Sequence, residues 1–153
     1  EAAEIWAGLL TTAMLLIGTL GQWLGGRQTD FWGAKKVLII TSSAVLVSFV
    51  FLVLTPASLW FVATAAFIAL YGIAFYGHQP ALNSLAGFIT PEDRRGLVYG
   101  VLFFIGFGMG SISQAITGYI SDKVSITIAF YVLTLFAATA LLLAFFINSY
   151  KRL

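Results

Sequence analysis

Long stretches without a charged side chain are the feature that most constrains this chain. No Asp, Glu, Lys or Arg occurs at residues 37–91, 96–121 or 124–150. A helix needs about 20 apolar residues to cross a bilayer core, so these stretches hold several spanning helices. Lipid admits only helices and closed barrels, and barrel strands alternate polar and apolar residues, which these stretches do not. The sequence therefore predicts an all-α membrane protein.

Composition agrees with this class. Hydrophobic residues make up 60% of the chain and charged residues 9%, whereas soluble domains contain about 45–50% and about 25%. The net charge of +2 comes from basic residues between the apolar stretches, so we expect no nucleic-acid partner. The chain has no cysteine, and its single histidine has no serine or carboxylate partner at a catalytic spacing. We expect no metal, no cofactor and no enzymatic activity.

Five spanning helices account for the uncharged stretches. They are expected at residues 5–26, 37–54, 59–88, 97–120 and 126–148, with short connections between them. Cytoplasmic loops are enriched in Lys and Arg, which allows the orientation to be predicted. Seven of the eight basic residues fall on one side of a five-helix arrangement, and only Lys123 falls on the other. We expect an integral protein of a plasma or inner membrane, with its N-terminus outside and its C-terminus in the cytoplasm.

An internal repeat relates the first and fourth expected helices. Residues 18–30 align without a gap on residues 110–122, and the identities are Gly18/Gly110, Gln22/Gln114, Gly26/Gly118 and Asp30/Asp122. These positions are four residues apart, so each set forms one ridge along its helix. The first copy ends on the cytoplasmic side and the second outside. Two similar helices of opposite orientation indicate an inverted-topology repeat, a construction found in secondary transporters.

The connection after the first helix carries a spaced set of residues: Gly26, Asp30, Gly33, Lys35 and Lys36. This set resembles the loop between the second and third helices of each six-helix half in the major facilitator superfamily of secondary transporters. Phe31 and Ala34 stand where the family usually has basic residues. The resemblance implies one transmembrane domain over residues 1–153, formed by helices 8–12 of the C-terminal half. The first helix of that half would then be missing before residue 1.

The resemblance also implies a function. Proteins of this family are secondary active transporters that move a small organic solute across the membrane by alternating access. The partners of this chain would be the lipid bilayer, the solute and the remaining helices of the transporter. The five spans contain no Asp, Glu, Lys or Arg, which favours an uncharged or amphiphilic solute, such as an efflux substrate. The alternative is a non-transporting five-helix anchor or assembly subunit.

Two groups of residues have expected mechanical roles. In the family, the acidic loop residue, here Asp30, docks one half against the other and holds one access state; alternatively, it is a solvated charge that marks topology. Glycines at three- or four-residue spacing let helices approach closely, whether in static packing, in a dimer or between moving bundles. The glycines expected in helix packing are Gly18, Gly21, Gly25, Gly100, Gly106, Gly110 and Gly118.

Polar and aromatic side chains cluster on the third expected helix, just before Pro80, which predicts a local kink. Such groups line cavities because lipid would leave them unpaired, and the resemblance places this helix beside the central cavity. The candidates for the substrate path are Tyr71, Phe75, His78 and Gln79, together with Gln114 on the fourth helix. His78 either carries a coupling proton, since histidine changes its charge near neutral pH, or hydrogen-bonds a neighbouring helix. Gln114 likewise either contacts the substrate or hydrogen-bonds a neighbouring helix.

Overall fold

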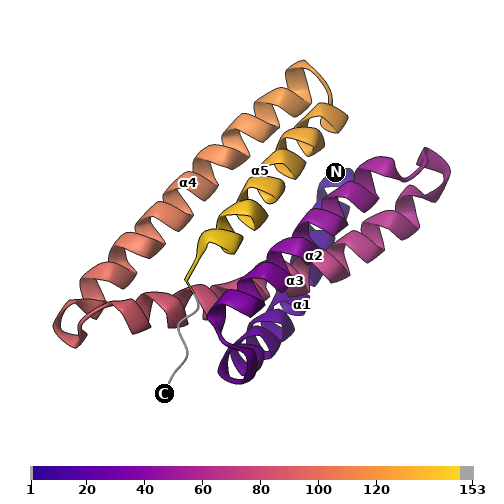
Figure 1. Ribbon diagram of the computed structural model, residues 1–153. Coiled ribbons are helices and arrows are strands. Elements are labelled where there is room, and N and C mark those ends of the chain that lie inside the picture. Colours follow the sequence, from indigo (N-terminus) through magenta and orange to yellow (C-terminus); the bar gives the residue numbers. More distant parts are fainter. Residues whose placement is uncertain (1, 149–153) are drawn as a thin grey trace.

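The computed structural model describes residues 2–148, and five long helices make up most of that range (Figure 1). They are α1 (Ala2–Trp32), α2 (Ala34–Leu54), α3 (Trp60–Ile89), α4 (Arg95–Lys123) and α5 (Ile126–Phe146). Two short 3₁₀ turns, η1 (Ala57–Leu59) and η2 (Glu92–Arg94), lead into α3 and α4. All five helices are long and apolar enough to cross a membrane. The all-α membrane fold with five spans is therefore confirmed.

The first two helices meet more tightly than the sequence predicted. The expected connection over residues 27–36 is wrong, because α1 continues to Trp32 and α2 begins at Ala34. Gly33 alone separates them, with φ 81° and ψ 153°, a backbone conformation nearly restricted to glycine. The polar residues before it remain helical, and the Thr29 hydroxyl donates to the Gly25 carbonyl at 2.7 Å. The charged segment is thus the end of one helix and the start of the next.

The other boundaries differ less from expectation. α3 begins and ends one residue later than expected, α4 exceeds residues 97–120 at both ends, and α5 ends at Phe146 instead of residue 148. Helical turns beyond the apolar stretches explain the extensions, because hydropathy detects the membrane-crossing part of a helix and not its polar ends. α1 and α4 run in opposite directions, as the inverted repeat predicts (Figure 1).

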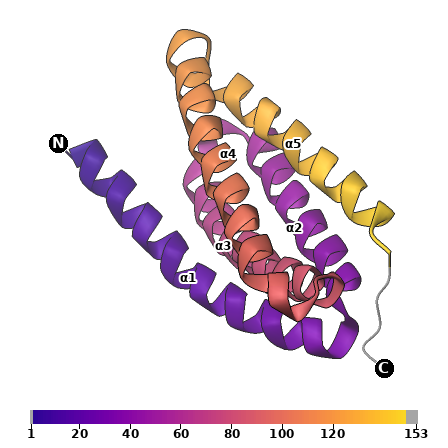
Figure 2. The same cartoon turned by 90° about the vertical axis from the view of Figure 1, so that its left-hand side faces the viewer.

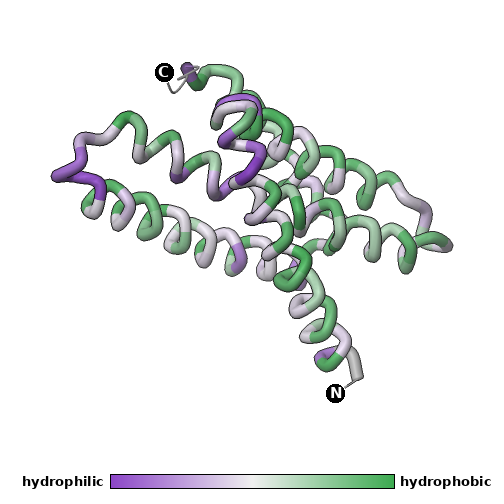
Figure 3. The backbone as a smooth tube through the Cα atoms, turned by 90° about the horizontal axis from the view of Figure 1, so that it is seen from below, coloured by the Kyte–Doolittle hydropathy of each residue, from purple (hydrophilic) through white to green (hydrophobic). Residues whose placement is uncertain are grey.

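Charged residues are found mainly at the helix connections (Figure 3). One end of the molecule carries the α1–α2 and α3–α4 connections, and we call it the basic end. Its basic residues among those described are Arg27, Lys35, Lys36, Arg94 and Arg95. The opposite end carries the α2–α3 and α4–α5 connections. Among the described residues, Lys123 is the one basic residue at that end.

α3 is the central helix of the bundle. It packs on α1 and α2, and α2 packs in turn on α5. Val37, Leu38, Ala81 and Ala144 form a buried cluster where α2, α3 and α5 meet. α4 packs mainly on α5 and contains no buried residue among those described. The first part of α1 and the last part of α4 diverge (Figure 2), and the most extensive packing joins α3 to α1 and to α2.

Candidate functional site

Glycines on α1 bring it into direct contact with α3. A Cβ added to Gly21 or Gly25 would overlap the α3 backbone, and one added to Gly18 would overlap the ring of Tyr76. From the other side, a Cβ on Gly77 would lie 3.2 Å from the carbonyl oxygen of Gly21. Small residues on both helices therefore set the distance between α1 and α3.

The glycines of α4 are placed differently. A Cβ at Gly100, Gly106, Gly110 or Gly118 would meet no atom within 4 Å among the described residues. We expected close packing there too, and in this respect the structure differs from the prediction. The reason is the position of α4 at the edge of the bundle, where no described helix covers this ridge.

An aromatic row runs along one face of α3. The row consists of Phe67, Tyr71, Phe75 and His78, spaced four, four and three residues apart, as neighbours on a helix surface are. The ring centroids of Phe67 and Tyr71 are 5.0 Å apart and nearly parallel, at 12°, and those of Tyr71 and Phe75 are 5.0 Å apart, at 14°. The imidazole of His78 continues the row, 5.2 Å from the Phe75 ring.

Neighbouring helices support this row through aromatic residues that the sequence analysis did not select. Phe49 of α2 is buried, and its ring lies 5.3 Å from Phe67 and 5.4 Å from Tyr71. Phe130 of α5 lies 6.3 Å from the rings of both Phe49 and Phe67. Its four-residue spacing from Tyr71 could have identified Phe67, but no sequence signal indicates that Phe49 and Phe130 meet the row.

A polar group stands at the end of the row. The side-chain amide of Gln22 on α1 donates to the amide oxygen of Gln79 on α3 at 3.0 Å. Beside Gln79, the Nδ1 atom of His78 bonds the backbone carbonyl of Phe75. A carbonyl only accepts, so Nδ1 carries the proton, and in the neutral ring Nε2 is left as an acceptor. Amide and imidazole groups thus adjoin the aromatic surface within the span of α3.

Pro80 follows this polar group without ending the helix, since α3 is continuous across it. A proline inside a helix removes one backbone hydrogen bond, here to the carbonyl of Tyr76. A Cβ at Gly26 would lie 3.8 Å from the Pro80 ring, so this glycine of the loop set belongs to the α1–α3 contact.

Gln114 lies apart from this group. It is exposed on α4, and its side chain has no hydrogen-bond partner among residues 2–148. The structure therefore joins Tyr71, Phe75, His78 and Gln79 into one surface, adds Gln22 to it, and leaves Gln114 outside.

A pocket of about 720 Å³ lies at the basic end, between the α1–α2 junction and the last third of α3. Asp30, Lys35 and Lys36 line it, and Asp30 forms no ion pair among the described residues. Its basic neighbours contact aromatic rings instead. The guanidinium of Arg27 lies 5.9 Å from the ring centres of Trp23 and Phe31.

The helix ends around Asp30 do not stabilise its carboxylate. It lies in the last turn of α1, where the partial negative charge of the helix end disfavours a carboxylate. Asp30 also does not accept a hydrogen bond from the first backbone amides of α2, because no side chain caps the start of that helix. Asp30 is thus an exposed carboxylate with no charged partner in residues 2–148.

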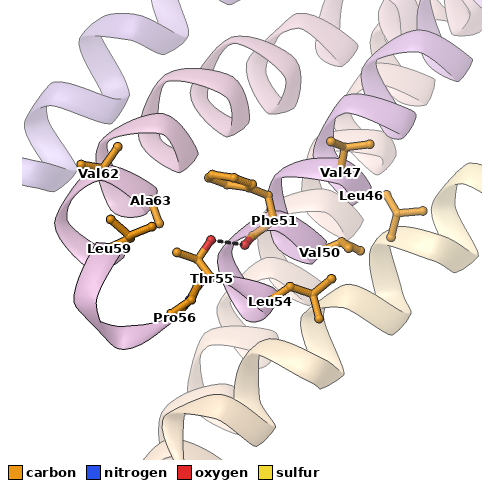
Figure 4. A pocket seen from close by; sticks show the side chains of 10 residues that line it. All are labelled: Leu46, Val47, Val50, Phe51, Leu54, Thr55, Pro56, Leu59, Val62 and Ala63. Atoms are coloured by element: carbon orange, nitrogen blue, oxygen red, sulfur yellow. Dashed lines mark hydrogen bonds between the residues drawn. The ribbon is translucent and has the colours of Figure 1, made fainter.

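A second hollow, of about 680 Å³, lies at the opposite end between α2 and α3 (Figure 4). Its lining is almost wholly apolar, with Leu and Val side chains around Phe51. Its polar side chain, Thr55, donates to the carbonyl of Phe51 at 2.7 Å. The hollow thus has one hydroxyl group in its lining, in contrast to the amide and imidazole groups of the surface on α3.

Comparison with known proteins agrees with this architecture. The family profile of the Major Facilitator Superfamily matches residues 2–152. The chain is 22% identical over 146 residues to the multidrug resistance protein MdtG of Dickeya zeae (strain Ech586), covering 95% of this chain and 35% of that relative. The chain thus spans about a third of the relative's length. No solved structure matches the chain. On its family match and its five-helix membrane fold, the chain belongs to the major facilitator superfamily.

Proposed function

We propose that this chain is part of a secondary active transporter that moves a small organic solute across the membrane by alternating access, in the efflux direction. Family membership supports transport, and the name of the MdtG relative, a multidrug resistance protein, supports drug-like organic compounds as the solutes. The observation that carries the proposal is the aromatic row of α3 with His78 and Gln79 at its end. Ligand sites are mostly apolar and aromatic, with a few polar groups that fix orientation, and this surface has that chemistry.

The chemistry of the row supports an uncharged or amphiphilic solute. No Asp, Glu, Lys or Arg lies on α3, so this helix offers aromatic rings, an amide and an imidazole but no fixed charge. Phe75 is 36% exposed and Tyr71 is half-buried, so a solute can reach the row. Gln114 contributes to the same path if other helices bring α4 towards α3.

A sixth helix completes this half in our proposal. An inverted repeat within a six-helix half consists of two triplets of helices, and α3 is then the first helix of the second triplet. Gly18, Gln22 and Gly26 of α1 contact this helix. Their counterparts on α4, the ridge from Gly110 to Gly118, contact nothing among the described residues. Under the symmetry of an inverted repeat, that ridge packs on the helix that opens the first triplet. This helix would fill the space beside α4.

Asp30 would then hold the two halves of the transporter together in one access state. Its exposure, and the absence of a charged partner within residues 2–148, support a partner on the other half. The excess of basic residues at that end supports a cytoplasmic position, with the N-terminus of the chain outside.

Transport into inverted vesicles that contain the intact protein tests the proposal. A panel of fluorescent dyes, from neutral and amphiphilic to multiply charged, identifies the solute class, and Tyr71→Leu and Gln79→Leu test the row. We expect both variants to slow uptake of neutral dyes at least tenfold, whereas Phe104→Leu on the exposed side of α4 leaves it unchanged. Full transport activity in both Tyr71→Leu and Gln79→Leu would show that the substrate path does not run along the aromatic row of α3.

His78 is tested separately, because coupling and binding have different signatures. If it carries the coupling proton, His78→Gln abolishes uptake driven by a pH gradient but retains exchange of labelled for unlabelled dye. If it only binds a neighbouring helix, gradient-driven uptake and exchange fall together.

A further inference from the structure

The basic end carries positive charge that no described carboxylate neutralises. Arg94 and Arg95, at the start of α4, have acidic neighbours at 3.7 and 3.4 Å. By contrast, Lys35, Lys36 and Arg27 form no ion pair among residues 2–148. Asp30 is the one carboxylate that lines the pocket there, against two lysines, so the pocket has a net positive charge.

The same pocket is amphipathic. Its polar lining comes from the helix junction and from Ser84, and its apolar side chains are Phe31, Trp32, Ile39, Ile40, Leu85 and Phe88. Its volume of about 720 Å³ is in the range of small-ligand sites. The ammonium of Lys36 lies 5.3 Å from the ring centre of Trp32, a contact that positions the cation without neutralising it.

We propose that this pocket binds an anionic phospholipid of the surrounding bilayer, with the headgroup phosphate at Lys35 and Lys36. The start of an acyl chain would lie on Ile39 and Ile40, one turn further into the apolar part of α2. Basic pockets between transmembrane helices bind anionic headgroups in this manner, and the aromatic rings beside it are typical of the level of the headgroups.

Trp32 provides a reporter because it lines the pocket. The intact protein is reconstituted in phosphatidylcholine vesicles that contain brominated phosphatidylglycerol, whose bromine atoms quench nearby tryptophan. The contribution of Trp32 is the part of the quenching that disappears in Trp32→Phe. Brominated phosphatidylcholine in place of brominated phosphatidylglycerol gives the reference. The Trp32 quenching by the anionic lipid, divided by the Trp32 quenching by phosphatidylcholine, measures the preference for anionic lipid. This measurement is independent of transport.

We expect the preference to fall about fivefold for each lysine replaced, in Lys35→Gln and Lys36→Gln. Asp30→Asn should raise it, because that variant removes the one negative charge of the pocket. Lys123→Gln, which removes the same charge at the opposite end, should leave it unchanged. Inorganic phosphate should not compete with the lipid.

If the variant that combines Lys35→Gln and Lys36→Gln kept the full preference for anionic lipid, the proposal would be overturned. An equal loss in Lys123→Gln would overturn it as well, because it would show attraction to the whole protein surface and not to the pocket. Displacement by inorganic phosphate would identify a site for a free anion instead of a lipid.

Discussion

Replacing Gly25 by alanine adds one methyl group at the tightest point between α1 and α3. The added Cβ would overlap the carbonyl group of Gly77, which belongs to the backbone of α3 and cannot rotate away. The two helices must separate to accept it. Separation also weakens the neighbouring contacts of Gly21 and Gly18, which lie on the same face.

The expected magnitude follows from two opposing terms. Adding a methyl group to a packed interface costs about 1–3 kcal/mol. Alanine is a better helix former than glycine and returns about 0.5–1 kcal/mol. Because backbone atoms oppose the methyl group at Gly25, the upper part of the first range applies, and the net loss of stability is about 1–2 kcal/mol.

Two further glycines make the prediction a graded series. At Gly77 the added Cβ would lie 3.2 Å from the Gly21 carbonyl oxygen, so a small shift suffices and the two terms nearly cancel. At Gly108 on α4 the added Cβ meets no described atom within 4 Å, so only the gain of about 0.5–1 kcal/mol remains. The order of stability is therefore Gly108→Ala, Gly77→Ala, Gly25→Ala.

Unfolding of the intact protein from mild detergent by added sodium dodecyl sulfate, followed by circular dichroism, measures the free energies. Gly25→Ala and Gly108→Ala should differ by about 1.5–3 kcal/mol, the sum of the loss and the gain. Equal effects of these two variants would refute the reasoning, because the helix-propensity term is the same at both positions. A stabilised Gly25→Ala would show that α1 and α3 are not in backbone contact.

Three other experiments each test one local feature of the structure. Gly33→Ala should destabilise the protein by about 1–3 kcal/mol through backbone strain, visible as a lower unfolding temperature. A double-mutant cycle of Gln22→Ala and Gln79→Ala should give a coupling of about 0.6 kcal/mol in the same unfolding assay, and zero coupling would contradict their hydrogen bond. Tyr99→Phe removes the donor to the Asn83 carbonyl at 3.2 Å, and should raise amide hydrogen exchange in the first turns of α4.

The number and order of the helices could be predicted because uncharged length is a property of the sequence alone. Four connections were found between stretches that lipid can accept, and five spans followed. The end of α1 was not found, because residues 27–30 are polar yet remain helical until Gly33 reverses the sign of φ. Polarity marks the limit of the membrane core and not that of the helix.

The candidate surface on α3 was predicted in part. The sequence grouped Tyr71, Phe75 and His78 on one helix before Pro80, and the structure places their rings in one row, with Tyr71 stacked on Phe75 and His78 tilted against it. Spacing does not say which helix a face meets, so the partners from α2 and α5 were missed. Glycine spacing has the same limit: it is similar on α1 and α4, yet the α1 glycines meet α3 and those of α4 meet no described neighbour.

That difference gives the sixth helix a direct test. Gly18 faces the Tyr76 ring, and its repeat counterpart Gly110 faces open space among residues 2–148. If another helix covers Gly110 in the intact protein, Gly110→Leu overpacks that contact and costs about 1–3 kcal/mol. Gly108→Leu, on the other face of α4, places the same side chain in lipid and should keep only the gain in helix propensity, which both variants share. If Gly110→Leu and Gly108→Leu were equally stable in the unfolding assay, no helix would cover Gly110 in the intact protein. The proposal of a sixth helix beside α4 would then be contradicted.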